Sequence, residues 1–455
     1  MVERVQRLVG AAKKLPVPEG TYAIGVGLII LGATAYGFQV LAAKRLSDAD
    51  YAALNILWAL VFVLTPGLFQ PLEQEVGRAL SHRRAQGLGG GPLVKRAATL
   101  GGILAVVVVA GSLIAYQPIV HELFNGRGGL MIGLVVAILC YFVAFITRGT
   151  LSGNGRFAPY GLMLGTEGAT RIVLCIVLFA IASSSPGWWG FALAIPPILA
   201  VGVALRGQHN LITPGPDAPY SELSGALAML LVASIFAQLL SYISVLGVQI
   251  LATPYQRKHV TAGFIAGVFI ARIPLLMFQA IQAALLPKLA RQASEGKHDD
   301  FRAGIMRLVI IVVSLCIVGT LVATAIGPEV GKKLFPTKWD LGSRDMFLLT
   351  FGLTLFIMAL TLAQGLIALK RYRENAFAWV AGVVAFVITV SVVGNQFLTN
   401  ESADDKLFLR NEIALVVGSV VSVILVGIFL LLAMRRNAGQ LEDLVEVIEH
   451  ETLEI

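Results

Sequence analysis

The chain has 455 residues, of which 57% are hydrophobic and only 14% are charged, and its mean hydropathy is +0.80. Soluble proteins carry about 25% charged residues, so this composition excludes a soluble globular protein; the long, unbroken apolar runs exclude a transmembrane β-barrel, whose short strands alternate in polarity. The formal net charge of +8 does not indicate a nucleic acid partner, because the basic residues lie in short connections between apolar runs. The predicted fold class is an all-α polytopic membrane protein.

Twelve apolar runs are each long enough to cross a bilayer, for which about 20 helical residues suffice. The first run is too long for the h-region of a signal peptide, which has about 7–15 apolar residues. The expected spans are residues 21–43, 51–72, 97–116, 129–147, 160–182, 188–205, 226–250, 260–286, 306–326, 345–369, 375–394 and 411–434.

The connections divide the chain into five parts. Residues 1–20 have an apolar face flanked by basic residues, which is typical of a helix on the inner membrane surface. Residues 206–225 contain the stretch TPGPDAPY, which is typical of an exposed linker, and separate an N-terminal six-helix bundle (residues 21–205) from a C-terminal one (residues 226–434). Residues 435–455 are acidic and favour a solvated tail over an amphipathic docking helix.

The distribution of basic residues predicts the orientation. If the N-terminus is cytoplasmic, the inner connections hold 21 lysines and arginines and the outer ones hold 11, with three more inside spans. Because lysine and arginine are enriched in cytoplasmic loops, we expect both termini in the cytoplasm and the protein in the inner (plasma) membrane.

The eighth span carries a charge near its middle. Arg272 is followed two residues later by Pro274, and Gln279 and Gln282 lie further along the same span. An unpaired arginine at mid-membrane costs roughly 2.5 to 3.5 kcal/mol on insertion scales, and the proline is expected to kink the helix beside it. We interpret this span as the wall of a polar cavity in a transporter; a structurally paired or snorkelling arginine is the alternative.

Further charged residues lie in or beside the N-terminal spans. Glu167 and Arg171 are four residues apart in the fifth span, so they share a helix face and are expected to pair; the pair is either structural or functional. Arg148 ends the fourth span, close enough to the membrane edge to snorkel. Glu73 ends the second span and is either solvated or titrates near a cavity.

Patterns that would indicate an enzyme or a cofactor are weak. The three cysteines lie in apolar spans and the six histidines in connections, so we expect no metal site and no cofactor. The glycine-rich residues 87–91 lack the ending of a phosphate-binding loop and predict a flexible turn. Asp48 and Asp50 lie where membrane glycosyltransferases often keep catalytic acids, but their loop is too short for a catalytic domain.

Three segments resemble the polysaccharide flippases of the MOP (multidrug/oligosaccharidyl-lipid/polysaccharide) exporter superfamily. Residues 43–54, AKRLSDADYAAL, resemble the family pattern aR-L-x-x-x-x-Y-G-x-L, with Ala52 in place of the usual glycine. Residues 271–289 are similar to the span A-x-R-L … P … L-L-P-x-L, with Pro274 closer to the arginine than is usual. Residues 327–335, GPEVGKKLF, resemble the outer loop after the ninth span.

The resemblance implies two six-helix bundles of the MATE/MOP type around a central cavity. It also implies a bacterial flippase, not an enzyme, that moves an isoprenoid-pyrophosphate-linked saccharide across the inner membrane for cell-surface polysaccharide assembly. Its partners would be the lipid-linked saccharide, membrane lipids and polysaccharide-assembly proteins. In relatives a cationic residue at the place of Arg272 lines the cavity, and a guanidinium suits a pyrophosphate.

The polar and charged residues of the spans, considered apart from the resemblance, give the remaining candidates for the site. Besides Arg272, the candidates for substrate binding are Arg171, Arg148 and Gln279, and those for ion coupling are Glu167 and Glu73. A cation-coupled multidrug antiporter of the same superfamily and, with less support, a membrane glycosyltransferase or polymerase are the alternative functions.

Overall fold

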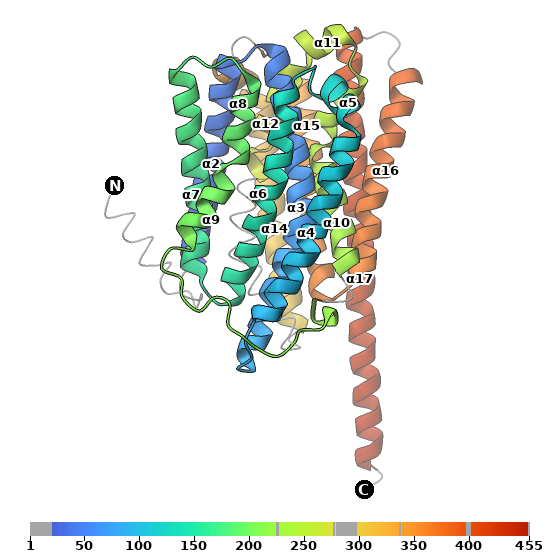
Figure 1. Cartoon of the computed structure of the whole chain (residues 1–455). Coiled ribbons are helices and arrows are strands. Elements are labelled where there is room, and N and C mark those ends of the chain that lie inside the picture. The colour runs from blue at the N-terminus through green and yellow to red at the C-terminus, as the bar shows by residue number, and fades with distance from the viewer. Residues whose placement is uncertain are drawn as a thin grey trace, which may run out of the picture.

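The computed structural model describes residues 21–223, 227–275, 278, 298–335, 338–339, 341–396 and 402–453. In these residues the regular secondary structure is helical, and eleven helices are long and apolar enough to cross a membrane. The long helices run side by side along one axis (Figure 1). The predicted all-α, multi-pass membrane fold is therefore confirmed.

The first half of the chain packs into one group of helices. α2 lies along α7, α3 lies along α6, and the short helices α8 and α9 pack against α6 and α7. The elements are α2 (Thr21–Arg45), α3 (Asp48–Ala85), α4 (Gly91–Ile114), α5 (Tyr116–Pro118), the π-helix η1 (Ile119–Leu123), α6 (Gly128–Gly153), α7 (Phe157–Ala180), α8 (Pro186–Ala194) and α9 (Pro196–Ala204).

α3 is longer than the second predicted span. It continues for thirteen residues beyond the predicted end at residue 72, to Ala85. Val76, Ala79 and Leu80 in this extension recur at helical spacing, and they pack with apolar residues of α4 and with Ala218 of the linker. The extension therefore carries α3 beyond the span to the end of the molecule where the linker lies, which we call the linker end (Figure 1).

The sixth predicted span is divided into two short helices. α8 ends at Ala194 and α9 begins at Pro196. Two consecutive prolines, Pro196 and Pro197, supply no backbone donors, so the hydrogen-bond ladder is interrupted there.

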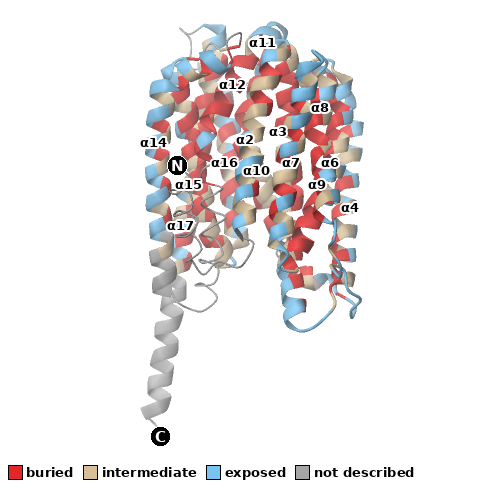
Figure 2. Cartoon of the chain, turned by 90° about the vertical axis from the view of Figure 1, so that its left-hand side faces the viewer, coloured by how far each residue is buried: buried red, intermediate tan, exposed pale blue. Residues whose placement is uncertain are grey.

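The second half of the chain forms a second group. α15 and α16 both lie along α17, α14 lies along α15, and α10 packs against both α16 and α3, joining the two groups (Figure 2). The elements are the 3-10 helix η2 (Tyr220–Leu223), α10 (Leu227–Leu251), α11 (Pro254–His259), α12 (Thr261–Ala271), α14 (His298–Leu334), α15 (Ser343–Ala368), α16 (Tyr372–Gln396) and α17 (Ala403–Leu453).

The eighth span begins as predicted, but α12 stops at the arginine. The backbone N–H of Arg272 caps the helix by donating to the carbonyls of Val268 (3.1 Å) and Phe269 (3.2 Å). Residues 273–275 are again helical after the turn at Arg272, so the helix is interrupted beside Pro274, in agreement with the expected kink. Gln279 and Gln282 lie outside the described residues.

Two helices continue beyond their predicted ends. α14 runs to Leu334, so the predicted outer loop from residue 327 begins as helix. α17 runs to Leu453, so residues 435–453 continue the helix of the twelfth span.

Candidate functional site

A cluster of charged residues is buried between α6 and α7 in the first half. The expected Glu167–Arg171 pair is present: Arg171 Nη2 lies 2.7 Å from Glu167 Oε1. The hydroxyl of Tyr141 donates to the same carboxylate oxygen (2.9 Å) and accepts a hydrogen bond from Arg171 Nη2 (3.1 Å). We call Tyr141, Arg148, Glu167 and Arg171 the N-half cluster.

Arg148 belongs to this cluster and does not snorkel. Its Nη2 donates to Glu167 Oε2 at 2.5 Å, and its side chain is 8% exposed. α6 continues beyond the predicted span to Gly153, and Gly149 packs closely on the backbone of Glu73 in α3. Arg148 is therefore inside the bundle, where it pairs with Glu167 and does not reach the membrane edge.

The N-half cluster has more cationic donors than acceptors. Two guanidinium groups share the single carboxylate of Glu167, and both Glu167 and Arg171 have 1% exposed side chains. Nε of Arg148, and Nε and Nη1 of Arg171, are buried without a hydrogen-bond partner among the described residues. Because a buried donor without an acceptor is costly, these atoms are suited to an anionic or hydroxyl-rich ligand.

Glu73 lies beside the cluster. Its Oε1 accepts a hydrogen bond of 2.7 Å from the hydroxyl of Tyr160, and its charge interacts with that of Arg148. The residue is half-buried and has a hydrogen-bond partner; its role in ion coupling stays a prediction.

Arg272 lies in a separate polar site in the second half. Its side chain is buried, Nη2 donates to Ser241 Oγ, and the guanidinium carbon lies 3.5 Å from the ring centroid of Tyr242, a cation–π contact. Nη1 has no hydrogen-bond partner, and Arg272 has no acidic partner, among the described residues.

Aromatic side chains connect the two arginine sites. The Tyr242 ring stacks on Phe62 of α3 (centroids 6.3 Å apart), and Phe62 contacts Tyr141 (6.1 Å) and Trp58 (4.8 Å). The Trp58 ring in turn lies 5.6 Å from the guanidinium carbon of Arg171. The N-half cluster and Arg272 thus lie on opposite sides of the contact between the two halves, with α3 between them.

Several residues of these sites were not predicted. Tyr141 precedes Arg148 by seven residues, or two helical turns, so the sequence carried a signal that the two share a face. Tyr242 and Ser241 carried no such signal. Glu412 lies one residue inside the predicted twelfth span, yet it is fully buried and both carboxylate oxygens lack a hydrogen-bond partner among the described residues.

Polar contacts across the two halves gather at the end opposite the linker. Lys338 Nζ donates to Leu46 O (3.0 Å) and to Asp48 Oδ1 (3.0 Å). Beside this group, Arg257 pairs with Glu122, and Gln249 donates to Asn125 Oδ1 at 3.1 Å. Gln249 Nε2 also donates to Leu123 O (3.3 Å), and further along the contact Ser234 donates to Pro66 O at 3.3 Å.

The acids of the junction before α3 have structural partners. Asp48 pairs with Lys338, while Asp50 pairs with Arg127 at 2.7 Å and accepts a hydrogen bond from Ser47, the N-cap of α3. These pairings do not favour a role as catalytic acids.

Comparisons with known proteins identify the fold. No family model matches the sequence. Uncharacterized proteins of Mycobacterium bovis and Mycobacterium tuberculosis are 23% identical over 378 residues, which cover 79% of this chain and 83% of theirs. The protein is a multi-pass helical membrane protein.

Solved structures define the class more closely. An inward-facing multidrug resistance MATE family transporter of the MOP superfamily matches with a TM-score of 0.70 and 13% identity, over 89% of this chain and 95% of that one. A MATE protein in its bent conformation matches with a TM-score of 0.68 and 13% identity, over 92% and 96%. The chain has the MATE transporter fold.

Proposed function

We propose that this protein is a flippase that moves an isoprenoid-pyrophosphate-linked saccharide across the bacterial inner membrane by alternating access. The observation that carries the proposal is the pair of buried arginine sites, one in each half, with guanidinium donors that have no acceptor in the described residues. A pyrophosphate supplies at least two negative charges and several acceptor oxygens, which match planar guanidinium groups.

The MATE fold and the placement of the polar contacts support alternating access. The halves are joined by ionic contacts at the end opposite the linker, so this conformation is closed at that end. With the linker end in the cytoplasm, as the loop charges indicate, the closed end is the outer one. The halves would rock about the region between Arg272 and the N-half cluster, and the lipid chain would remain in the bilayer.

Arg272→Ala tests the proposal in vesicles that contain the purified protein and a short-chain, fluorescent polyprenyl-pyrophosphate sugar. Loss of charge-assisted hydrogen bonds, worth about 1.5–3 kcal/mol each, should slow movement between leaflets by roughly ten- to hundredfold. Arg206→Ala, which removes an exposed arginine in the linker, should leave the rate unchanged. Equal rates for the wild type and Arg272→Ala would exclude Arg272 from substrate binding.

A cation-coupled multidrug antiporter is the second candidate. The buried carboxyl of Glu412, which has no hydrogen-bond partner among the described residues, favours it, because buried acids are suited to bind protons or cations. Uptake of an organic cation driven by a proton or sodium gradient, with no leaflet movement of the pyrophosphate lipid, would favour this function over the flippase.

A further inference from the structure

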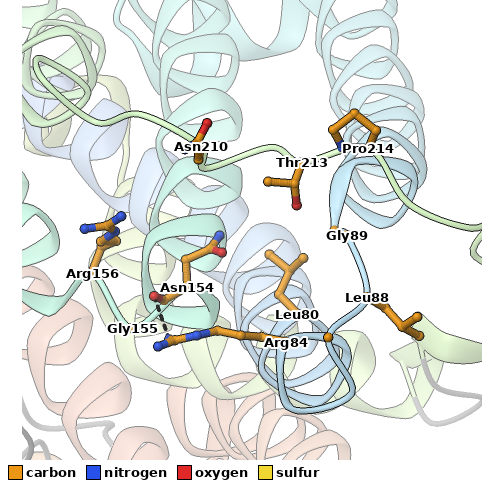
Figure 3. A pocket seen from close by; sticks show the side chains of 12 residues that line it. Leu80, Arg84, Leu88, Gly89, Asn154, Gly155, Arg156, Asn210, Thr213 and Pro214 are labelled. Atoms are coloured by element: carbon orange, nitrogen blue, oxygen red, sulfur yellow. Dashed lines mark hydrogen bonds between the residues drawn. The ribbon is translucent and has the colours of Figure 1, made fainter.

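A cavity of about 680 Å³ lies at the linker end, apart from both arginine sites (Figure 3). Its volume falls within the roughly 300–1,000 Å³ of small-molecule sites. The end of α3, the loop before α4, the turn between α6 and α7, and the linker form its walls. The lining residues include two arginines and no acid: Leu80, Arg84, Gly87, Leu88, Gly89, Gly90, Asn154, Gly155, Arg156, Asn210, Thr213 and Pro214.

The glycine-rich loop forms one wall of this cavity, and the linker backbone packs on it. Gly91 N–H donates to Thr213 O at 2.8 Å. A side chain at Gly89 would place its Cβ 1.9 Å from the carbonyl oxygen of Pro214. The glycines therefore allow the linker backbone to pack directly on the loop and close the cavity on that side.

The arginines of α3, of the start of α4 and of the turn between α6 and α7 fall into two classes. Three are neutralised by acids, in the pairs Arg78–Glu75, Arg83–Glu222 and Arg96–Asp217. Arg84 and Arg156 have no acidic partner among the described residues, and both line the cavity (Figure 3). Arg84 Nη1 makes one hydrogen bond, to Asn154 O at 2.8 Å, and its other donors make none to the described residues.

We propose that this cavity binds a phosphate group, carried either by a lipid headgroup or by a soluble phosphate compound. Two unpaired guanidinium groups offer the fork geometry that phosphate oxygens accept. α4 begins at the cavity, and its N-cap, Gly90, makes no side-chain cap, so the positive end of the helix adds to the field. Leu88 in the lining, and Ile212 beside Thr213, are exposed apolar residues suited to the chains of a lipid.

The test measures binding to the purified full-length protein and does not depend on the proposed transport function. One arm titrates inorganic pyrophosphate into the protein in a neutral detergent, by calorimetry. The other counts phosphatidylglycerol molecules retained in native mass spectrometry, with phosphatidylcholine as the uncharged comparison. Both arms use the wild type, Arg84→Gln/Arg156→Gln, and Lys95→Gln as the control, because Lys95 is exposed at the same end but does not line the cavity.

Removal of both arginines should weaken binding by about tenfold or more, while Lys95→Gln should bind as the wild type does. If the double variant loses only the binding of phosphatidylglycerol, the ligand is a lipid headgroup. If it loses the binding of pyrophosphate, the ligand is a soluble phosphate compound. Absence of binding in both arms, or equal binding by the wild type and the double variant, would overturn the proposal. Both arginines are exposed, and an unchanged unfolding temperature will confirm that the double variant is folded.

Discussion

Glu167 is the counter-ion of two buried arginines. Its two oxygens accept from Arg148 and Arg171 separately, so loss of its charge leaves both guanidinium groups uncompensated in a buried position. Removal of one partner from a buried charged pair costs about 3–5 kcal/mol, whereas an intact pair contributes little net stability. We therefore expect the charge of Glu167 to stabilise the folded protein.

We expect Glu167→Gln to lower the thermal unfolding temperature of the purified protein markedly, by loss of about 3–5 kcal/mol. Because glutamine retains the shape of the glutamate side chain, the change in unfolding temperature reports the loss of its negative charge. An unfolding temperature equal to that of the wild type would show that Arg148 and Arg171 do not need Glu167.

Glu412→Gln is the matched control for this change, since Glu412 is equally buried but its carboxylate accepts no hydrogen bond from the described residues. An ionised carboxylate without a partner is costly in a buried position, so the amide should leave the unfolding temperature unchanged or raise it. A fall as large as that of Glu167→Gln would mean that Glu412 has a stabilising cation.

At the scale of the element, the linker is fixed to the first half by one buried arginine. Arg83 Nε and Nη2 donate to the two carboxylate oxygens of Glu222 (2.7 and 3.0 Å). The same guanidinium donates to the carbonyls of Gly89, Pro216 and Asp217 at 2.9–3.0 Å. A segment that composition marks as an exposed linker is thus held to the end of α3.

This contact makes the linker sensitive to acid. Arg83 lowers the pKa of Glu222, and a hydrogen bond from Arg96 lowers that of Asp217, so both carboxylates bind protons less readily in the folded protein. The two carboxylates stabilise the folded linker at any pH above the ordinary carboxyl pKa, about 4. This stabilisation is lost as the pH falls through their lowered pKa values. Hydrogen exchange of linker amides, corrected for intrinsic rates, should therefore accelerate below about pH 4.

The variant Glu222→Gln provides the comparison for this prediction. It should show fast exchange in the linker already at pH 6, with a weaker dependence on pH. If the linker amides of the variant and the wild type are equally protected at pH 6, the Arg83–Glu222 pair does not hold the linker in place.

At the scale of the whole molecule, the contacts around Lys338 hold the two halves together at the end opposite the linker. The ammonium group is buried, with a 3% exposed side chain, between Leu46 O and Asp48 of the first half. Phe335 packs near Tyr51 at the same place (centroids 6.3 Å apart). A conformation open at this end, which is the outward-open one in the proposed orientation, must break these contacts.

Lys338→Met should therefore shift the population toward the outward-open state. A cysteine introduced as Phe335→Cys reports the change, because Phe335 is buried while this end is closed. Labelling by a membrane-impermeant maleimide from the outer side should be several-fold faster with Lys338→Met than without it. The same rate in both backgrounds would show that Lys338 does not hold the end closed.

Local sequence patterns predicted the helices but not all of their ends. Continuous apolar runs predicted the spans, and the four-residue spacing predicted the Glu167–Arg171 pair. The extension of α3 was missed because its apolar residues lie on one helix face, toward α4 and the linker. They are separated by charged residues and do not form a continuous apolar run. The snorkelling of Arg148 was wrong for a related reason: position in a span does not reveal which neighbouring helix a side chain faces.

The sequence alone determined that this is a multi-pass α-helical membrane protein, because in a bilayer the backbone must satisfy its hydrogen bonds within each helix and long apolar runs leave no other solution. Only the tertiary structure decided which polar groups meet. The joining of Arg148 to Glu167, the placement of Arg272 on Tyr242, the pairing of Asp48 with Lys338 and the fixing of the linker by Arg83 all connect residues of different helices or segments. Such contacts depend on the rotation and depth at which helices pack, and no local periodicity specifies these.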